Sequence, residues 1–136
     1  MPDTLRLEIV TPEAVVYSED VDMVTLPGVV GEIGILPQHV RLMMQMVPGE
    51  MIVHKGGSDS FLAVGEGLVE VTSDRVAIVT DMAVSSGSID EALAEEACQR
   101  AEARLRERIS EEESASATAV LARSLAQLQV KRRRRA

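Results

Sequence analysis

The chain has 136 residues, with 22 acidic and 14 basic side chains and a formal net charge of −8 at pH 7. This length suits one domain, or one small domain with an appendage, and the acidic balance disfavours general binding to a nucleic-acid backbone. Tyr17 and Phe61 are the only aromatic residues, so stacking on nucleic-acid bases is not expected either. A single cysteine, Cys98, excludes an internal disulfide, and no stretch reaches the length of a membrane helix, so we expect a soluble cytoplasmic chain.

Glycine and proline are confined to the first two-thirds of the chain, which divides it into two parts. All nine glycines lie at or before Gly87 and all five prolines at or before Pro48, whereas residues 88–136 hold eleven alanines. Glycine and proline mark turns between strands, and alanine favours helix. We therefore predict a β domain over residues 1–86 and a helical domain over residues 87–136.

Residues 1–86 carry short runs in which apolar and polar side chains alternate. The runs span residues 5–9, 51–53, 61–64, 68–72 and 75–80, and turn-forming pairs such as Pro27-Gly28 and Gly56-Gly57 lie between strands. Strands of this length and spacing are typical of an antiparallel β-sandwich or barrel. We expect a sandwich whose core is aliphatic and rich in methionine.

In residues 87–136, apolar residues recur at helical spacing in two stripes. The first stripe is Leu93, Ala97, Ala101, Leu105 and Ile109, and the second is Ala117, Val120, Leu121, Leu125 and Leu128. Between them, Ser110 and Glu113 have the spacing of a capping box, which predicts a helix start after Ser110. We predict an antiparallel two-helix hairpin, with one continuous helix as the alternative because neither glycine nor proline enforces the break. The small side chains bury little area, so the hairpin should be weakly held.

No catalytic or metal-binding motif can be assembled from these residues. Gly65-Glu66-Gly67 does not continue into a G-x-G-x-x-G loop, because Glu70 occupies the third glycine position. His39 and His54 are the only imidazoles, and neither is spaced from a cysteine as metal ligands are. We expect no catalytic residue and no metal site.

Two segments favour binding to a partner. Residues 28–39 hold three glycines and a proline, which predicts a sharply shaped loop leading into a strand; a glycine-rich hairpin without a partner is the alternative. Residues 131–135 are five consecutive cations, suited to nucleic acid, anionic lipid or an acidic protein surface. A frayed, solubilising terminus is the alternative for this run.

The order of these parts resembles the epsilon subunit family of bacterial rotary ATP synthases. Residues 31–39, GEIGILPQH, are similar to the family's Gly-Glu-x-Gly-x-x-Pro-x-His signature. Residues 5–13 resemble its first strand, residues 61–71 its strand, glycine pair and strand, and residues 89–92 the opening of its helical domain. The resemblance covers essentially residues 3–130 and implies an N-terminal β-sandwich followed by a C-terminal helical hairpin.

The resemblance also implies a function that composition and spacing do not reveal. It implies a rotor subunit without catalytic activity of its own, which binds the gamma subunit and the c-ring and helps couple proton flow to ATP synthesis. The complex would lie at the cytoplasmic face of the bacterial plasma membrane, with this chain as a peripheral component. The contacts with the c-ring or gamma would involve Gly31, Glu32, Gly34 and His39.

The family's helical domain can swing toward the catalytic head and inhibit ATP hydrolysis, and the resemblance extends this role to residues 87–136. Basic side chains would then grip an acidic loop of the beta subunit, with transient contact to alpha. These residues are Arg104, Arg108, Arg123, Lys131, Arg132, Arg133, Arg134 and Arg135. The alternative function is a small nucleic-acid-associated protein that uses the C-terminal arginine run.

Some members of the family bind ATP in the hairpin through an Ile-Asp-x-x-Arg-Ala motif, which this chain only partly retains. Leu93 replaces the motif's arginine, and Gln127 aligns with a later arginine of the family. The positions that remain are Ile89, Asp90, Ala94, Arg100 and Arg123. Charge-assisted hydrogen bonds stabilise by about 1.5–3 kcal/mol each, so losing two should make ATP binding weak or absent. We therefore expect no cofactor.

Overall fold

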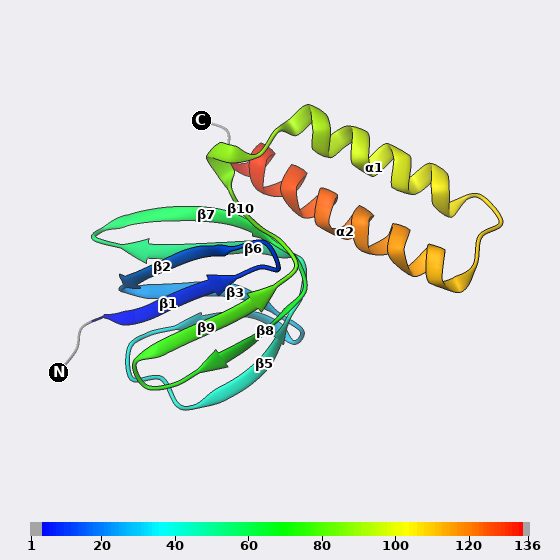
Figure 1. Ribbon diagram of the computed structural model, residues 1–136. Helices are drawn as coiled ribbons and strands as arrows, with labels where there is room; N and C mark the ends of the chain where they lie inside the picture. The colour runs from blue at the N-terminus through cyan, green and yellow to red at the C-terminus, as the bar shows by residue number, and fades with distance from the viewer. Residues whose placement is uncertain (1–3, 135–136) are drawn as a thin grey trace.

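The computed structural model describes residues 4–134 as a β-sandwich followed by an antiparallel pair of helices (Figure 1). The strands are β1 (Leu5–Val10), β2 (Val15–Val21), β3 (Met23–Gly28), β4 (Gly31–Ile35), β5 (Leu42–Met46), β6 (Gly49–Lys55), β7 (Ser58–Val64), β8 (Gly67–Val71), β9 (Arg75–Thr80) and β10 (Ala83–Ser85). A single 3₁₀ turn, η1 (Ser86–Ser88), leads into α1 (Glu91–Leu105) and α2 (Glu111–Arg133). The predicted fold class is therefore confirmed.

The strands form one continuous hydrogen-bonded path that folds over itself. Its order is β10-β7-β6-β3-β5-β8-β9-β1-β2, and β4 pairs with β3 beside this path. Neighbouring strands are antiparallel except β1 and β9, which run parallel with Leu7 opposite Val76. The expectation of an antiparallel sandwich is thus correct for the other described pairs but wrong for this one, which joins elements far apart in the sequence.

The alternation of apolar and polar residues sets which side of each strand is buried. In β1, Leu5, Leu7 and Ile9 point into the core, while Arg6 remains exposed. Successive side chains of a strand point to opposite faces, so this pattern allows only one register toward the core. The same alternation recurs in β3 and β9.

The core is aliphatic, with two methionines fully buried, as expected. Met46 and Met51 are inaccessible to solvent and pack in one cluster with residues such as Leu7, Ile9 and Leu26. Burying one such side chain stabilises the fold by about 1.5–3 kcal/mol.

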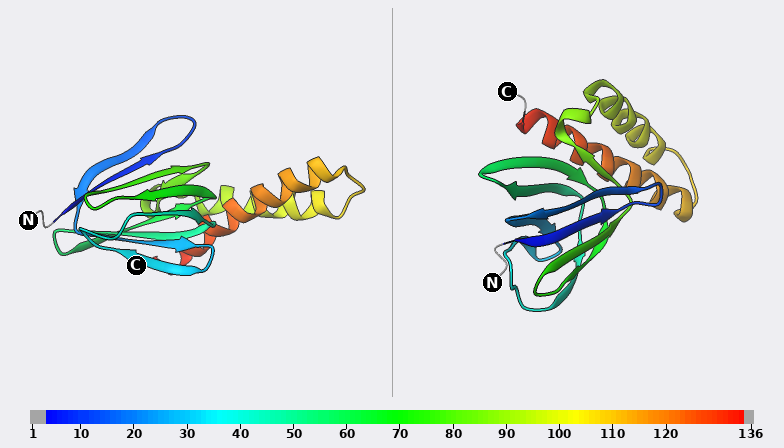
Figure 2. Two further views of the ribbon diagram at one scale, coloured as in Figure 1. Left: turned by 90° about the horizontal axis from the view of Figure 1, so that it is seen from below. Right: turned by 60° about the vertical axis from the view of Figure 1, so that its left-hand side comes forward.

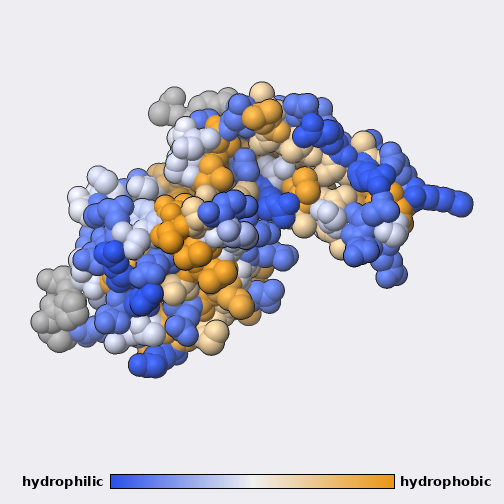
Figure 3. Space-filling model, in the orientation of Figure 1, coloured by the Kyte–Doolittle hydropathy of each residue, from blue (hydrophilic) through white to orange (hydrophobic). Residues whose placement is uncertain are grey.

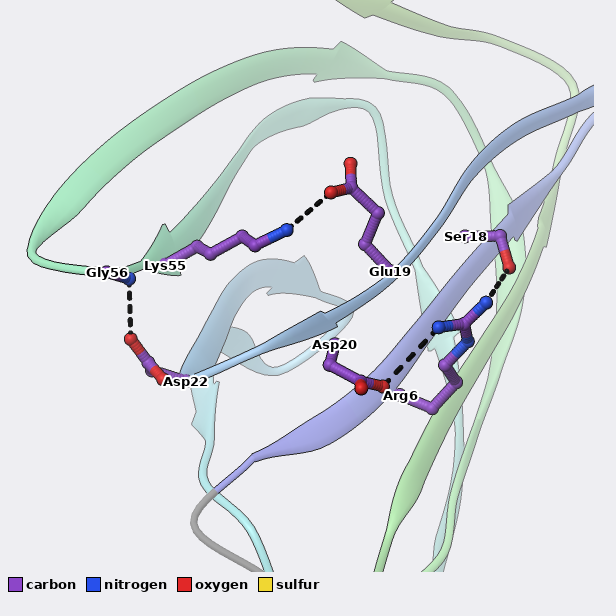
Figure 4. A network of polar contacts seen from close by, with 7 residues as sticks. All are labelled: Arg6, Ser18, Glu19, Asp20, Asp22, Lys55 and Gly56. Atoms are coloured by element: carbon purple, nitrogen blue, oxygen red, sulfur yellow. Dashed lines mark hydrogen bonds and ion pairs between the residues drawn. The ribbon is translucent and has the colours of Figure 1, made fainter.

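Polar contacts connect β2 to the strands around it (Figure 4). Arg6 donates to Ser18 at 2.9 Å, which adds a side-chain contact to the β1–β2 pair. Lys55, at the end of β6, pairs with Glu19 of β2, and the backbone N–H of Gly56 donates to Asp22 at 2.8 Å. These contacts link β2 at the end of the strand path to the β6–β7 turn, so the path approaches closure into a barrel.

The helical part is a hairpin, and the alternative of one continuous helix is wrong. Asp90 caps α1 by accepting a hydrogen bond from the backbone N–H of Leu93 at 3.1 Å. Ser110 caps α2 by accepting from the N–H of Glu113 at 3.1 Å, which confirms the predicted start. The side chain of Glu113 pairs with Arg104 of α1 and thereby links the two helices across the connecting turn.

The predicted apolar stripes are partly wrong. Leu93 and Leu125 are exposed, and the buried residues of α1 are Ala94, Cys98 and Ala101. Counting in steps of four drifts by about 40° per step from the 3.6-residue helical period, so a long stripe of this kind leaves the buried face. Ala94 and Cys98 instead pack against Leu128 in a narrow cluster of mostly small side chains.

The hairpin projects away from the sandwich, with its connecting turn at the far end (Figure 2). Contact with the sandwich comes from α2, whose buried Ala126 and Val130 pack with Ala63 and Met82. Among the residues that the structure describes, no helix combines the length and apolar character needed to span a membrane.

Candidate interaction surfaces

Residues 28–39 form a tight turn that leads into strand β4, as expected, and a further loop follows β4; because β4 pairs with β3, the turn closes a strand hairpin. Gly28 pairs with Gly31 at the end of the β3–β4 ladder, and Val29 and Val30 lie exposed between them. Gly31 has a φ of 126°, a backbone conformation that residues other than glycine rarely adopt. Glu32 follows it on β4 and is exposed, so Gly31 and Glu32 together form the tip of this hairpin.

The other two residues expected to contact a partner lie farther along the chain. Gly34 is in the middle of β4, opposite Thr25. His39 lies beyond the end of β4 away from the tip, and its Nδ1 is 2.8 Å from the carbonyl oxygen of Val40. Nearby, the backbone N–H of Gln38 donates to the carbonyl of Ser73 at 2.6 Å. The structure therefore places Glu32 and His39 at opposite ends of β4 and does not bring them together.

A groove lies between β4 and β5. Within residues 4–134, β4 pairs with β3 alone, so its other edge is unpaired. The groove is lined by Val29, Val30, Gly31, Glu32, Ile33, Leu42, Met44 and Gln45. An unpaired strand edge beside apolar side chains is a common site for contact with another protein.

A second surface is a row of apolar side chains across four neighbouring strands, which we call the apolar row: Leu68, Val79, Val10 and Val15. Leu68 pairs with Val79, Val79 with Val10, and Val10 with Val15, so the four follow one another across β8, β9, β1 and β2. Leu68, Val79 and Val15 are 58%, 62% and 63% exposed. Figure 3 shows apolar side chains gathered over β1 and β9 on this face.

The apolar row and the β3–β4 tip lie at the same end of the sandwich. Gly28, beside the tip, pairs with Met46, which pairs with Gly67, and Gly67 pairs with Thr80. Sequence reasoning missed the row, although a signal was present. In β8 and β9, apolar residues occupy consecutive positions at Leu68-Val69 and Ile78-Val79, so one of each pair must face outward.

A third feature is the basic end of α2, which docks on the sandwich. Arg134 donates to Glu50 through Nε at 2.9 Å and through a terminal nitrogen at 2.6 Å, and Arg133 adds a contact at 3.2 Å. Burial raises the pKa of the Glu50 carboxyl, but the two arginines outweigh it, so the pKa lies below its ordinary value. The alternative of a frayed terminus is therefore wrong up to Arg134, while Arg135 lies outside the described residues.

Comparison with known proteins identifies the family. Residues 4–86 match the family described as ATP synthase, Delta/Epsilon chain, beta-sandwich domain, and residues 88–132 match ATP synthase, Delta/Epsilon chain, long alpha-helix domain. This chain belongs to the ATP synthase delta/epsilon chain family.

Individual members of the delta/epsilon family match over nearly the whole chain. The ATP synthase epsilon chain of Herpetosiphon aurantiacus is 44% identical over 131 residues, covering 96% of each chain. ATP synthase epsilon chain 2 of Syntrophotalea carbinolica is 42% identical, covering 96% of this chain and 95% of the relative. The function expected from the sequence, that of an ATP synthase epsilon subunit, is confirmed by these matches, and the nucleic-acid alternative has no support in them.

Solved structures share the fold. A chain in the mitochondrial ATP synthase of Euglena gracilis, solved as OSCP/F1/c-ring, superposes with a TM-score of 0.78 at 23% identity, covering 95% of this chain and 81% of that one. A chain in the central stalk/c-ring structure of the Tetrahymena thermophila enzyme gives a TM-score of 0.65 at 10% identity, covering 93% and 96%.

The positions that the sequence resemblance associated with ATP binding have structural roles in this conformation. Ile89 and Ala94 are buried, and Asp90 caps α1. Arg100 is exposed and pairs with Glu96 one turn earlier on α1, whereas Arg123 pairs with Asp81 beside β9 at 3.2 Å. The two arginines thus point to carboxylates on different elements.

The remaining basic residues of the hairpin are also mostly paired internally. Arg104 pairs with Glu107 and Glu113, and Arg132 pairs with Glu91 at 2.8 Å and Glu95 at 3.5 Å. Lys131 donates to the carbonyl of Ser86 at 3.2 Å, and Arg108 is exposed. Among the described residues, no group of three or more His, Cys, Asp or Glu side chains could hold a metal ion.

Proposed function

We propose that this chain is a non-catalytic rotor subunit in the central stalk of a proton-transporting ATP synthase. It would act at the cytoplasmic face of the bacterial plasma membrane, as a peripheral part of the complex. The bacterial relatives named ATP synthase epsilon chain support this role, as does the fold shared with a chain of a central stalk/c-ring assembly.

The observation that carries the proposal is the apolar row. A single exposed leucine or valine is ordinary, but a contiguous row on adjacent strands is typical of a protein–protein interface. Met43 on β5 is 67% exposed and pairs with Glu70 of β8. Glu70 lies two residues after Leu68 and therefore on the same face of β8, so Met43 extends this face onto β5. We assign this face, made by β5, β8, β9, β1 and β2, to contact with the gamma subunit.

The β3–β4 tip is assigned to the c-ring. Gly31 and Glu32 lie together at one end of the sandwich, next to Val29 and Val30, so an exposed carboxylate and apolar side chains are presented side by side. His39, at the opposite end of β4, would belong to a separate contact. Because the tip and the apolar row share one end of the sandwich, a single rotor assembly can contact both surfaces.

The hairpin is proposed to restrain ATP hydrolysis. Among the described residues, α2 packs on the sandwich mainly through Ala126 and Val130, so detachment would break few apolar contacts of the helix. Once detached, Arg123, Arg133 and Arg134 would lose their partners on the sandwich and, with the exposed Arg108, would be available to acidic loops of the beta subunit, with transient contact to alpha. Arg104 would join them by exchanging its hairpin partners Glu107 and Glu113. Arginine pairs with carboxylates through two parallel hydrogen bonds, which suits such a grip.

Co-purification with the gamma subunit tests the rotor assignment. A Leu68→Glu/Val79→Glu variant places charges in the apolar row, and Leu93→Glu places one on an equally exposed leucine of α1 as a control. The row variant should remain folded and lose most of its gamma binding, while the control should bind normally. Full gamma binding by a folded row variant would refute the assigned surface.

A further inference from the structure

The last turns of α2 attach the hairpin to the sandwich. Ala126 and Val130 are the buried side chains of α2 in this contact, and they pack against Ala63, Met82 and Ile89. Within residues 4–134, the helix thus contributes only two buried apolar side chains to it, both of modest size. α1 is separated from the sandwich by α2 (Figure 1). Because this apolar contact is small, much of the free energy that holds the hairpin on the sandwich should come from the polar groups around it.

Glu50 of β6 is the most enclosed of the carboxylates that pair with α2. Its side chain is only 9% exposed, whereas that of Asp81, which pairs with Arg123, is 41% exposed. Both oxygens of Glu50 accept hydrogen bonds from Arg134, and Arg133 approaches one of them at 3.2 Å. The guanidinium of Arg134 also lies 3.8 Å from the ring centre of Phe61 on β7. A guanidinium that donates two hydrogen bonds to a partly buried carboxylate forms one of the stronger kinds of ion pair in proteins. The contact with the Phe61 ring adds a cation–π interaction.

We propose that Glu50 is a latch that keeps the hairpin docked by holding Arg133 and Arg134. The same two arginines cannot bind an acidic protein surface until the latch opens. The position of the hairpin is therefore a competition between one internal carboxylate and the carboxylates of a partner. The effect on ATP hydrolysis rests on the proposed inhibitory role, whereas the equilibrium between docked and released hairpin does not.

The ion pairs between α2 and α1 do not act in this way, and the one from Arg123 to Asp81 of the sandwich involves a much more exposed carboxylate than Glu50. Arg132 pairs with Glu91 and Glu95 of α1, so these contacts travel with the hairpin when it leaves as one body. The Glu50 pairs exist only in the docked state, because their partners lie on different parts of the molecule. After release, Glu50 and both arginines become hydrated, so no buried charge is left unpaired. The strength of the latch therefore acts directly on the equilibrium.

Spin labels on the isolated full-length chain can report this equilibrium. Labels at Ser60 of β7 and Ser116 of α2, both exposed, in a Cys98→Ser background would give distances for the docked and released hairpin. The test variants are Glu50→Gln, Arg134→Gln and the two combined. Glu13→Gln removes an equal charge from an exposed turn and serves as the control.

Glu50→Gln should raise the ratio of released to docked hairpin roughly tenfold over the control, the effect of losing one charge-assisted contact. Arg134→Gln should act in the same direction, and the double variant should add little, because both single changes break the same pair. Raising the ionic strength from about 0.05 to about 0.5 M should release the wild-type hairpin more than that of the double variant. Identical distance distributions for Glu50→Gln and Glu13→Gln would overturn the latch.

Hydrolysis by the assembled enzyme separates the latch from the inhibitory role. Glu50→Gln should slow ATP hydrolysis several-fold relative to Glu13→Gln, because it frees arginines for the partner. A larger released fraction with an unchanged hydrolysis rate would overturn the inhibitory role and leave the latch standing. An unchanged released fraction overturns the latch whatever the hydrolysis rate.

Discussion

Gly67, the first residue of β8, shows how a single position sets the packing of the sandwich. A Cβ atom added there would overlap the backbone carbonyl oxygen of Val79 and lie 3.0 Å from Cα of Thr80. Neither atom belongs to a flexible side chain, so the strands themselves would have to separate. Glu66, the residue before it, remains exposed.

Gly67→Ala is therefore expected to lower the free energy of unfolding by about 1–3 kcal/mol, as overpacking does. Urea denaturation of the isolated chain measures the change. Gly87→Ala is the matched control, since no atom lies within 4 Å of its added Cβ and its φ is not in the left-handed region. An equal denaturation midpoint for the two variants would contradict the steric argument.

Glu32 is a second single position with a specific expected effect. Substituting it should change coupling in the assembled enzyme and not the folding of the chain. It is exposed at the β3–β4 tip, so Glu32→Lys should leave the denaturation midpoint essentially unchanged. If the tip contacts the c-ring as proposed, reversing this charge should reduce ATP-driven proton pumping in reconstituted membranes, and Glu32→Gln should reduce it less. Normal pumping by a fully incorporated Glu32→Lys complex would count against the assigned contact.

The methionines of strand β5 differ in burial according to the side of the strand on which they lie. Met46 is fully buried, as is Met51 on β6, whereas Met43 is exposed and Met44 half-buried. The sequence predicts methionines in the core, and strand alternation makes this correct for Met46 and Met51 but leaves Met43 on the surface.

Met46→Gln should cost about 2–4 kcal/mol of stability, because it removes apolar contacts and buries an amide. Met43→Gln should leave stability within about 0.5 kcal/mol and weaken gamma binding. Denaturation curves together with gamma affinity distinguish the two positions. Comparable loss of the fold in both variants would mean that Met43 serves only the core.

The docking of α2 should depend on pH through Glu50. Burial raises the pKa of this carboxyl, and the larger combined effect of Arg134 and Arg133 brings it below the ordinary value of about 4.5. The docked state thus binds fewer protons than the released state, so ionised Glu50 stabilises docking above that pH. This stabilisation is lost as the pH falls below about 4.5 and through the lowered pKa.

The spin-labelled chain provides the measurement. The docked fraction of the wild type should fall as the pH drops below about 4.5, and the docked fraction of Glu50→Gln should show a smaller change over the same range. Asp59, whose charge also acts on Arg134, is left in place in both chains, so the difference between them isolates Glu50. Parallel pH curves would contradict the assignment.

Local signals in the sequence were enough for much of the element structure. The alternation of Leu5, Leu7 and Ile9 predicts the buried side of β1, and Ser110 with Glu113 predicts the start of α2. The parallel pairing of β1 with β9 could not be predicted, since alternation specifies which face a strand buries but not which strand lies beside it. Leu93 was placed on the wrong face because a four-residue spacing only approximates the helical period.

At the scale of the whole molecule, the features that connect the two parts lie far apart in the sequence. Arg134 and Glu50 are separated by 84 positions, and no local pattern marks Glu50 among 22 acidic residues. The β3–β4 tip lies within residues 28–39, which the sequence singled out because their glycines and proline fall in one short segment. The apolar row was not singled out, because it becomes contiguous only when β8, β9, β1 and β2 are assembled.

The hairpin is joined to the sandwich at one end, through the chain connection after β10 and the last turns of α2. Its connecting turn lies far from the sandwich (Figure 2), so the proposed release would turn the hairpin about this attachment. Arg133 and Arg134 lie at the attachment itself. They therefore stabilise the docked state through Glu50, and in the proposed inhibited state they would bind the partner instead.

This double use predicts effects of opposite sign for two changes at the same contact. A chain ending near Gly87 should still assemble and leave ATP hydrolysis faster than the full-length chain does, because the proposed brake is absent. Removing residues 131–136 should give part of that increase, since the grip is lost even though the hairpin is released more often. Glu50→Gln also releases the hairpin but keeps the arginines, so it should slow hydrolysis instead. Hydrolysis rates of the reconstituted enzyme, at matched occupancy of the subunit, measure all three. Equal rates for full-length and truncated chains would leave the hairpin without an inhibitory role, and a faster rate with Glu50→Gln would mean that the arginines do not bind the partner.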